Sequence, residues 1–191
     1  MSKLYENCFR MINIAYVNEI SDACQQHGID AQEMIQACSS KPYGFMPFTP
    51  GLGVGGTCIP VNPYYLFENN ELPLLKIATQ MSEARPIRKA RDLVQQFRPK
   101  SVLVIGVAYK PGTHITYCSP VNPFIKTLRE AGVDVTCYDP LAVQKETKNL
   151  SQDDWKVSVV DSFDLIVVAV KQTGVDFSLL KCVDSRKVII F

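Results

Sequence analysis

Cys58 directly follows a run of glycines, and its surroundings favour nucleophilic chemistry. The segment reads F-T-P-G-L-G-V-G-G-T-C-I-P-V-N-P-Y-Y-L and begins at Phe48. Glycines permit a positive φ and a close approach of the backbone to a ligand. The apolar residues from Ile59 to Phe67 predict a helix, and a thiol near a helix N-terminus is held more readily as the reactive thiolate. A tight turn beside a buried, inert thiol is the alternative, and these features alone favour neither interpretation. The glycines are Gly51, Gly53, Gly55 and Gly56.

Two helices are predicted ahead of this segment and would position it. Apolar residues recur with the 3.6-residue period from Ser2 to His27, and Gly28 is placed to end that helix. Asp30 and Glu33 have the spacing of a capping box, which predicts a second helix from Ala31 to about Ser39. The Cys58 segment is therefore expected to follow two helices and a loop from Lys41 to Pro50.

The second half of the chain alternates strands with helices. Pro73 to Phe97 is predicted to be helical, and Pro86 within it predicts a kink or a junction of two helices. Ser119 and Pro120 predict the N-cap and first position of a helix that ends at Gly132. This alternation predicts right-handed βαβ units, a doubly wound parallel sheet and the α/β class. Apolar runs predict strands at Ser101 to Val107, Val133 to Tyr138, Asp164 to Val170 and Lys187 to Phe191, with a short helix around Phe177 to Leu180.

Composition excludes several classes of function. The 191 residues are 47% hydrophobic and 20% charged, which is typical of a globular protein with one ordinary domain or two small ones. A net charge of +1 with no run of Lys or Arg argues against a nucleic-acid or membrane partner. No apolar stretch reaches the length of a membrane span, and the first residues lack the apolar segment of a signal peptide. We therefore expect a cytoplasmic protein.

The seven cysteines are expected to be reduced thiols, most of them small core residues. Their number is odd, they lack C-x-x-C spacing, and they are not arranged with the two histidines as metal ligands. We expect no metal site.

The glycine-cysteine segment closely resembles the active-site segment of the UDP-glucose, GDP-mannose and UDP-N-acetylmannosamine dehydrogenase superfamily. Its P-V-x-P-Y-Y ending is most similar to the N-acetylhexosamine branch. The resemblance implies that Cys58 forms a thiohemiacetal with the sugar aldehyde and then a thioester, which water hydrolyses. It also implies that Gly53, Gly55 and Gly56 bind the substrate.

The same resemblance implies roles for three polar residues. The start of the chain, S-K-L-x-E-N-x-F-R, is similar to the long helix that connects the two nucleotide-binding domains of the family and packs in its dimer interface. Lys3 matches the family's catalytic lysine, which would stabilise the oxyanion of the thiohemiacetal. Asn7, one helical turn later, would bond a sugar hydroxyl or water. Asn62 stands where the family has Asp, and because an amide cannot act as a base, thioester hydrolysis is expected to be impaired.

The sequence G-V-A-Y-K-P from Gly106 resembles the signature of the family's UDP-binding domain and matches Tyr109 and Lys110 with substrate-binding positions. No G-x-G-x-x-G follows the first strand, so this half is predicted to be a poor dinucleotide site. Tyr117 stands where the family has an arginine that reaches the cofactor region, and Tyr cannot replace its charged fork. We expect only a weak cofactor contact at Tyr117. The C-Y-D-P sequence that ends at Pro140 also fits the family.

These motifs imply two domains. Residues 1–98 would form a helical central or dimerisation domain with the Cys58 loop, and residues 99–191 a Rossmann-like UDP-sugar-binding domain. Complete members carry a further N-terminal domain of roughly 200 residues that binds NAD, and this chain is expected to lack it. The implied partners are a UDP-sugar and either a second copy of the chain or a different chain that supplies the NAD domain.

Two functions follow from the resemblance. The chain could be part of an NAD-dependent UDP-sugar 6-dehydrogenase, which oxidises the C6 alcohol to a carboxylate for surface polysaccharide synthesis. It could instead be a non-catalytic partner that binds a sugar nucleotide or pairs with a complete paralogue. Cys58, Lys3 and Asn7 favour the first function. Asn62, Tyr117 and the expected lack of an NAD domain favour the second.

Overall fold

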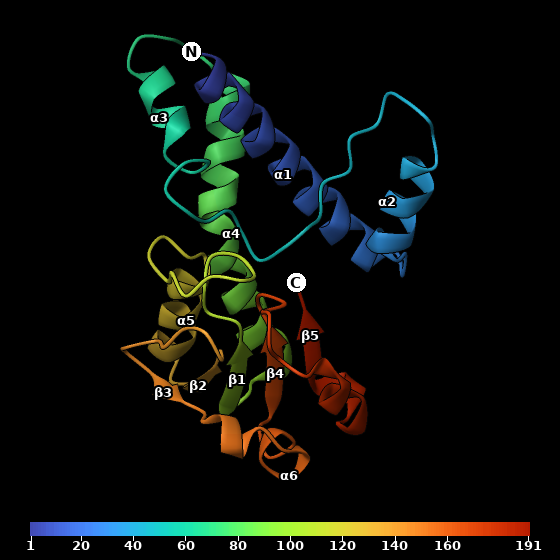
Figure 1. The fold of residues 1–191 in the computed structure, drawn as a ribbon, viewed down its shortest axis with the longest axis vertical. Helices are drawn as coiled ribbons and strands as arrows, with labels where there is room; N and C mark the ends of the chain where they lie inside the picture. The colour runs from blue at the N-terminus through green and yellow to red at the C-terminus, as the bar shows by residue number, and fades with distance from the viewer. The chain divides into compact units, whose positions relative to one another are not determined.

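The computed structural model describes residues 1–191 and divides within one long helix into two compact units, Met1–Glu83 and Ala84–Phe191. The first unit is helical and the second is α/β, so the predicted class is confirmed (Figure 1). The elements in chain order, with η for 3-10 helices, are α1 (Ser2–Gln26), α2 (Ala31–Ser39), α3 (Asn62–Phe67), α4 (Pro73–Phe97), β1 (Ser101–Ile105), α5 (Val121–Glu130), β2 (Asp134–Tyr138), β3 (Lys148–Asn149), η1 (Gln152–Asp154), α6 (Val157–Val160), β4 (Leu165–Val168), η2 (Phe177–Cys182), η3 (Ser185–Lys187) and β5 (Val188–Ile190).

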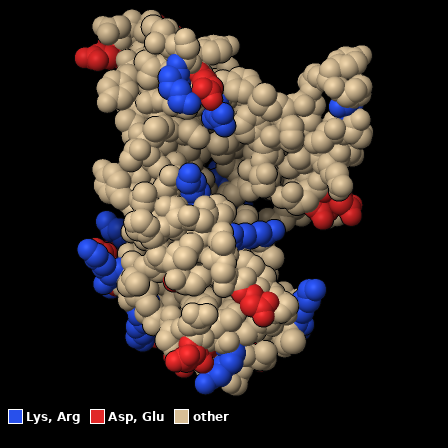
Figure 2. All heavy atoms as spheres, viewed as in Figure 1, with Lys and Arg blue, Asp and Glu red and all other residues tan.

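Charged side chains of both signs are distributed over the surface. Figure 2 shows Lys and Arg side chains spread over the visible face, several of them next to Asp or Glu. This face therefore presents no continuous basic stripe to a phosphate backbone. None of the helices combines the length and the apolar character that a membrane span requires.

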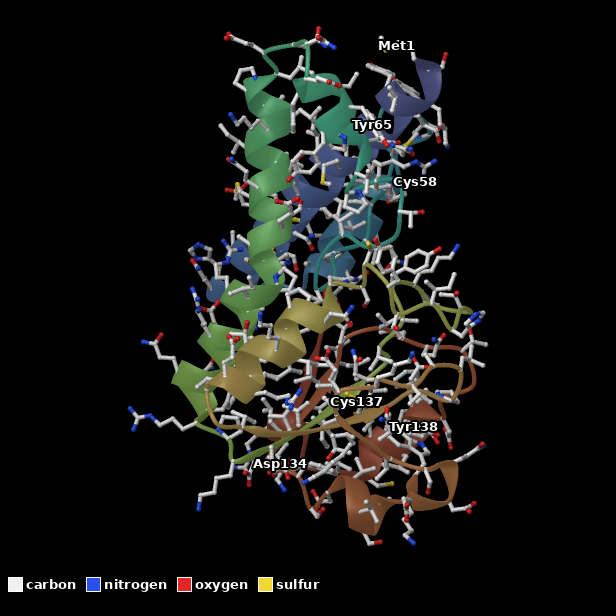
Figure 3. All side chains as sticks on the ribbon, turned by 90° about the vertical axis from the view of Figure 1, so that its left-hand side faces the viewer. Met1, Cys58, Tyr65, Asp134, Cys137 and Tyr138 are labelled. Carbon is white, nitrogen blue, oxygen red and sulfur yellow. The ribbon has the colours of Figure 1, made fainter.

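The first unit packs around α1, α3 and the first turns of α4. Cys8 and Met11 of α1 are buried with Leu75 of α4, and Ile59 and Phe67 pack onto them. Full burial of a large apolar side chain contributes about 1.5–3 kcal/mol, so this cluster is sufficient to hold α3 against α1. Figures 1 and 3 both show α3 beside the N-terminal half of α1.

Helices α1 and α2 confirm the predicted helices at Ser2 to His27 and Ala31 to Ser39. Gly28 has a φ of +67° immediately after α1, where a left-handed residue ends a helix without strain. The Asp30 carboxylate accepts hydrogen bonds from the N–H groups of Gln32 and Glu33, and it therefore caps α2 as its spacing predicted.

Two expectations about the other helices of this unit are corrected. The helix predicted from Ile59 begins only at Asn62, because Pro60 disfavours a helical backbone at the residue before it. Pro63 lies in the first turn of α3, where its missing N–H leaves no hydrogen bond unmade. Helix α4 continues through Pro86 as one element and is not divided into two helices.

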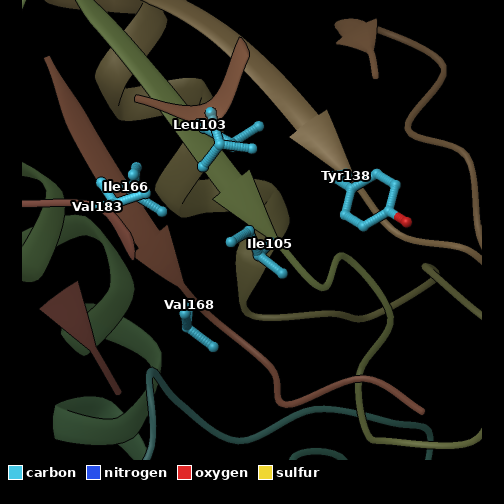
Figure 4. Packing of buried hydrophobic residues seen from close by; sticks show 7 residues of the cluster. Leu103, Ile105, Tyr138, Ile166, Val168 and Val183 are labelled. Carbon is cyan, nitrogen blue, oxygen red and sulfur yellow. The ribbon is translucent and has the colours of Figure 1, made fainter. Parts of the chain in front are cut away.

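The second unit is built on a five-stranded parallel sheet with the strand order β3-β2-β1-β4-β5. Strand β1 lies at the centre, and Val102 is aligned with Val135 on β2 and Leu165 on β4. Val102 to Ile105 have no exposed surface, as expected for a strand covered on both faces. Figure 4 shows part of the core that these strands form, with Leu103, Ile105, Tyr138, Ile166, Val168 and Val183 labelled.

The four predicted strands are confirmed as β1, β2, β4 and β5, each shorter than expected. Asp164 lies just before β4, and its carboxylate accepts hydrogen bonds from the N–H groups of Ser101 (2.9 Å) and Lys100 (2.8 Å) at the start of β1. These bonds hold the pKa of the Asp164 carboxyl below its usual value. The short edge strand β3 was not predicted, since its two residues are exposed and carry no apolar pattern.

Two predicted helices of this unit are also adjusted. Helix α5 begins at Val121 rather than at Pro120, and the Ser119 hydroxyl accepts a hydrogen bond from the Val121 N–H. The short helix expected near Phe177 is the 3-10 helix η2.

Gly106 is expected to be the glycine least tolerant of substitution. It follows β1 with a φ of +78°, and an added Cβ atom would lie 2.2 Å from the Val170 carbonyl oxygen. A left-handed L-residue costs about 1–2 kcal/mol and overpacking about 1–3 kcal/mol more. Gly106→Ala should therefore lower the free energy of unfolding in urea by about 3 kcal/mol or more.

Gly132→Ala is the matched control for this prediction. Gly132 has a φ of +84° but no atom within 4 Å of an added Cβ, so only the backbone term of about 1–2 kcal/mol should be lost. Equal losses for the two variants would show that the chain relieves the contact with Val170 at no cost.

Candidate functional site

The Cys58 thiol lies exposed on the turn that leads into α3. Its sulfur lies 4.0 Å from the Thr57 hydroxyl oxygen, and its carbonyl oxygen accepts hydrogen bonds from the N–H groups of Val61 (3.2 Å) and Asn62 (2.9 Å). Figure 3 shows Cys58 towards the end of this unit that also carries Met1. The alternative of a buried, inert thiol therefore does not describe Cys58, which is open to a substrate.

In the glycine run from Gly51 to Gly56, Gly56 alone has a left-handed backbone, with a φ of +90°. Gly53 and Gly55 lie outside the left-handed region, so the expectation of positive φ along the run is correct only for Gly56. The start of the loop is anchored, because the Gly51 N–H donates to the Asn18 side-chain oxygen (2.8 Å). The loop therefore turns sharply just two residues before the thiol.

Two of the predicted site residues, Asn7 and Asn62, are in direct contact although they lie 55 residues apart in the chain. Asn7 Nδ2 donates a hydrogen bond to Asn62 Oδ1. Asn7 is 4% exposed on α1, and Asn62 is the first residue of α3. The Asn62 backbone N–H also donates to the Cys58 carbonyl oxygen. The bond from Asn7 therefore fixes the Asn62 side-chain amide beside the Cys58 turn.

Lys3 is paired with a carboxylate rather than with the thiol. Its Nζ lies 3.0 Å from Glu6 Oε2, and Arg10 Nη2 lies 2.7 Å from the other oxygen of Glu6. The hydrogen bonds from Arg10 and Lys3 lower the pKa of the Glu6 carboxyl. All three side chains are largely exposed, so the group forms an open ion-pair chain along α1.

A second polar contact holds α3, and no sequence pattern predicted it. The Tyr64 hydroxyl donates a hydrogen bond to Glu83 Oε1 on α4. This bond to a carboxylate raises the pKa of Tyr64 to about 12. Helix α3 is therefore tied by Asn62 at its start and by Tyr64 one half-turn later, which limits how far the Cys58 turn can shift.

The second group of predicted site residues lies on the loop after β1. Lys110 Nζ lies 5.5 Å from the centre of the Tyr109 ring, within the range of a cation–π contact. Lys110 is exposed and Tyr109 is half-buried. Tyr117, in the same loop, is 70% exposed. The loop leaves the sheet at the point where the strand order reverses between β1 and β4, which is where open α/β sheets bind ligands.

Asp139 organises this loop and was not among the predicted site residues, although it belongs to the C-Y-D-P motif. Its Oδ2 accepts hydrogen bonds from the N–H groups of Val107 (2.9 Å) and Ala108 (3.3 Å). Its Oδ1 accepts from Leu141 (2.9 Å) and Ala142 (3.1 Å). Its position at the carboxyl end of a central strand was the signal that could have identified it.

A dinucleotide does not fit this edge of the sheet. In dinucleotide-binding folds the backbone N–H groups after the first strand approach the diphosphate. Here the N–H groups of Val107 and Ala108 donate to Asp139. At Gly106, an added Cβ would meet the Val170 backbone. The structure thus gives a physical reason for the weak dinucleotide site that the missing glycine fingerprint predicted.

Two family models match the chain. The model of the UDP-glucose/GDP-mannose dehydrogenase family, central domain, matches residues 1–85. The model of the UDP-glucose/GDP-mannose dehydrogenase family, UDP binding domain, matches residues 103–190. The two matched regions contain the Cys58 turn and the loop after β1, respectively.

Curated relatives and solved structures agree with these models. The chain is 34% identical over 178 residues to the UDP-N-acetyl-D-mannosamine dehydrogenase of Pyrococcus horikoshii, with 88% of this chain and 41% of the relative covered. It is 28% identical over 181 residues to the UDP-glucose 6-dehydrogenase of Rickettsia bellii, covering 87% and 42%. The solved UDP-D-ManNAc dehydrogenase from Pyrococcus horikoshii superposes with a TM-score of 0.80 at 31% identity, covering 100% of this chain and 46% of that one. The chain thus spans less than half the length of these relatives.

Proposed function

The chain belongs to the UDP-glucose/GDP-mannose dehydrogenase family, and we propose that it supplies the thiol-bearing and UDP-binding parts of a UDP-sugar 6-dehydrogenase. The substrate we propose is a UDP-N-acetylhexosamine, with UDP-glucose as the alternative. The observation that carries the proposal is the hydrogen bond between Asn7 and Asn62. It brings together two residues that were predicted to serve the reaction, and it does so beside the exposed Cys58 turn.

The proposed chemistry at Cys58 is the oxidation of a C6 aldehyde through a covalent intermediate. The thiolate sulfur adds to the aldehyde carbon, and the carbonyl electron pair moves onto oxygen to give a thiohemiacetal. Lys3 stabilises the oxyanion. It can reach this role because an exposed ion pair such as the one with Glu6 contributes little stability and opens readily. Asn7 and Asn62 hold a sugar hydroxyl or the hydrolytic water.

Two NAD molecules are the proposed hydride acceptors, one for the C6 alcohol and a second for the thiohemiacetal. Since the residues after β1 do not fit a dinucleotide, we assign NAD to a domain outside residues 1–191 and expect at most a weak contact from Tyr117. We keep residues 1–98 and 99–191 as the two domains. A second copy of the chain or a different chain with the NAD domain is the proposed partner, in the cytoplasm.

The role of the second unit is binding of the UDP moiety, with Tyr109 and Lys110 as its contacts. Gly53, Gly55 and Gly56 are the proposed contacts of the sugar. Tyr109 offers an aromatic face to a uracil ring, and Lys110 offers a positive charge to the diphosphate. Both side chains lie at the strand-order switch of the sheet, which supports their use as ligand contacts.

UDP binding to the 191-residue chain tests this assignment by calorimetry. The chain should bind UDP, and Lys110→Ala should weaken binding by about tenfold, the effect of one charge-assisted hydrogen bond. Lys145→Ala, which removes another exposed lysine, is the control and should leave the affinity unchanged. A chain that does not bind UDP, or that loses affinity equally in both variants, would contradict the assignment.

A further inference from the structure

Gln172 is a buried polar residue whose side chain connects two segments that follow different strands. It is 2% exposed. Its Oε1 accepts hydrogen bonds from the N–H groups of Gly112 (2.7 Å) and Thr173 (2.9 Å), and its Nε2 donates to the Thr113 carbonyl oxygen (3.0 Å) and to Asp139 Oδ2 (3.1 Å). Both donors and both acceptor positions of the amide are used. Since a buried polar group left without a hydrogen bond is destabilising, these four bonds fix the conformation of the Gln172 side chain.

The segment that Gln172 holds is the turn that carries Tyr109 and Lys110. The Tyr109 N–H donates to the Ile115 carbonyl oxygen (3.1 Å), so residues 109–115 form a closed turn. Gly112, inside this turn, has a φ of +72°. The turn is bonded across its ends through Ile115 and in its middle through Gln172. The position of the Lys110 side chain therefore depends on both bonds.

Asp139 fixes the residues immediately before the same turn. One of its oxygens accepts from Val107, Ala108 and Gln172 together. Asp139 follows β2 and Gln172 follows β4, and these two strands flank β1 on opposite sides. The loop after β1 is thus held from both neighbouring strands by two side chains that also contact each other.

We propose that Asp139 and Gln172 are positioning residues that set the Tyr109–Lys110 turn in the shape that binds a uridine diphosphate. This role rests on the proposed function and adds a reason for the ligand class. Because the Asp139 carboxylate occupies the N–H groups of Val107 and Ala108, the charge of a diphosphate is left to the Lys110 side chain. The site then selects a ligand whose diphosphate binds the Lys110 ammonium group. It does not require the backbone N–H groups of a glycine-rich loop.

The coupling between Gln172 and Lys110 tests the proposal in the 191-residue chain. Gln172→Met keeps the length of the side chain and removes its four hydrogen bonds, so the affinity for UDP should fall about tenfold or more. In the Lys110→Ala background the same substitution should lower the affinity for UDP only about twofold, because the lysine through which Gln172 acts has been removed. Gln152→Met changes an exposed glutamine and should have no effect. Equal losses in both backgrounds would overturn the proposal.

Hydrogen exchange of the wild-type chain gives a second readout that does not depend on a variant that folds. Without UDP, the Gly112 amide should exchange at least about tenfold more slowly than that of His114 in the same turn, because Gln172 holds it. An unprotected Gly112 amide would refute the positioning role even if UDP binds. A protected Gly112 amide in a chain that does not bind UDP would instead refute the proposed function, and with it the ligand that this turn is proposed to serve.

Discussion

Cys58→Ser is expected to abolish both the covalent intermediate and turnover when the chain is joined to a dinucleotide-binding domain. The test protein is a fusion to the part of the Pyrococcus horikoshii relative that this chain does not match, since the matched part is 41% of that relative. The serine hydroxyl is a weak nucleophile without an adjacent base. The turnover of UDP-N-acetylmannosamine should therefore fall by roughly 10³-fold or more, in the range seen when an enzyme loses its nucleophile.

Mass spectrometry of the intact fusion, stopped in the presence of substrate, checks the intermediate directly. The protein with Cys58 should gain the mass of a UDP-uronyl group, and Cys58→Ser should show no such gain. Cys38→Ser and Cys182→Ser are the controls, because both residues are exposed free thiols outside the glycine loop. A UDP-uronyl adduct that persists in Cys58→Ser would move the chemistry to another residue.

The sequence predicts candidate site residues of the first unit but not the contacts between them. Cys58, Asn7 and Asn62 stand out because their types and spacing match a motif. Their arrangement required the tertiary structure, because Asn7 reaches Asn62 only when α3 packs on Cys8 and Met11 of α1. The periodicity of α1 shows which residues are apolar, but it does not show which later segment covers them.

Lys3 illustrates the opposite outcome. The motif predicts a role at the thiohemiacetal, and in the structure the same side chain pairs with Glu6, three residues away. Local pairs of this kind form on any helix with the right spacing, and they are weak when exposed. The ion pair of Lys3 with Glu6 in the chain without substrate therefore does not indicate which group Lys3 would contact when a substrate is bound.

In the second unit, every strand except β3 was predictable from the sequence, and the hydrogen bonds of the loops were not. Continuous apolar runs identify β1 and β4 because both faces of these strands are buried. Asp139 and Gln172 are common loop residues in the sequence, since a single Asp or Gln after a strand has many uses. The hydrogen bond between them follows from the strand order, which places the ends of β2 and β4 on either side of the loop after β1.

Asn62→Asp is expected to convert a fusion that accumulates the thioester into one that turns over. Hydrolysis requires water oxygen to form a bond to the thioester carbon while the carbon–sulfur bond breaks and the thiolate leaves. The water must also lose a proton. Asn62 can orient the water but cannot accept that proton, whereas Asp can. The substitution should remove the adduct on Cys58 and raise turnover by about 100-fold, the lower end of the effect of a positioned acid–base group.

The structure can accommodate Asp at position 62, because the side-chain oxygen of Asn62 already accepts a hydrogen bond there. Asn7 Nδ2 donates to Asn62 Oδ1, and a carboxylate at residue 62 would accept the same hydrogen bond and remain beside the Cys58 turn. Asn69→Asp adds an equal charge at an exposed position and should change neither the adduct nor the turnover. If the unmodified fusion turns over freely without an adduct and Asn62→Asp changes nothing, then Asn62 does not limit hydrolysis, and the proton must be taken by a group other than residue 62.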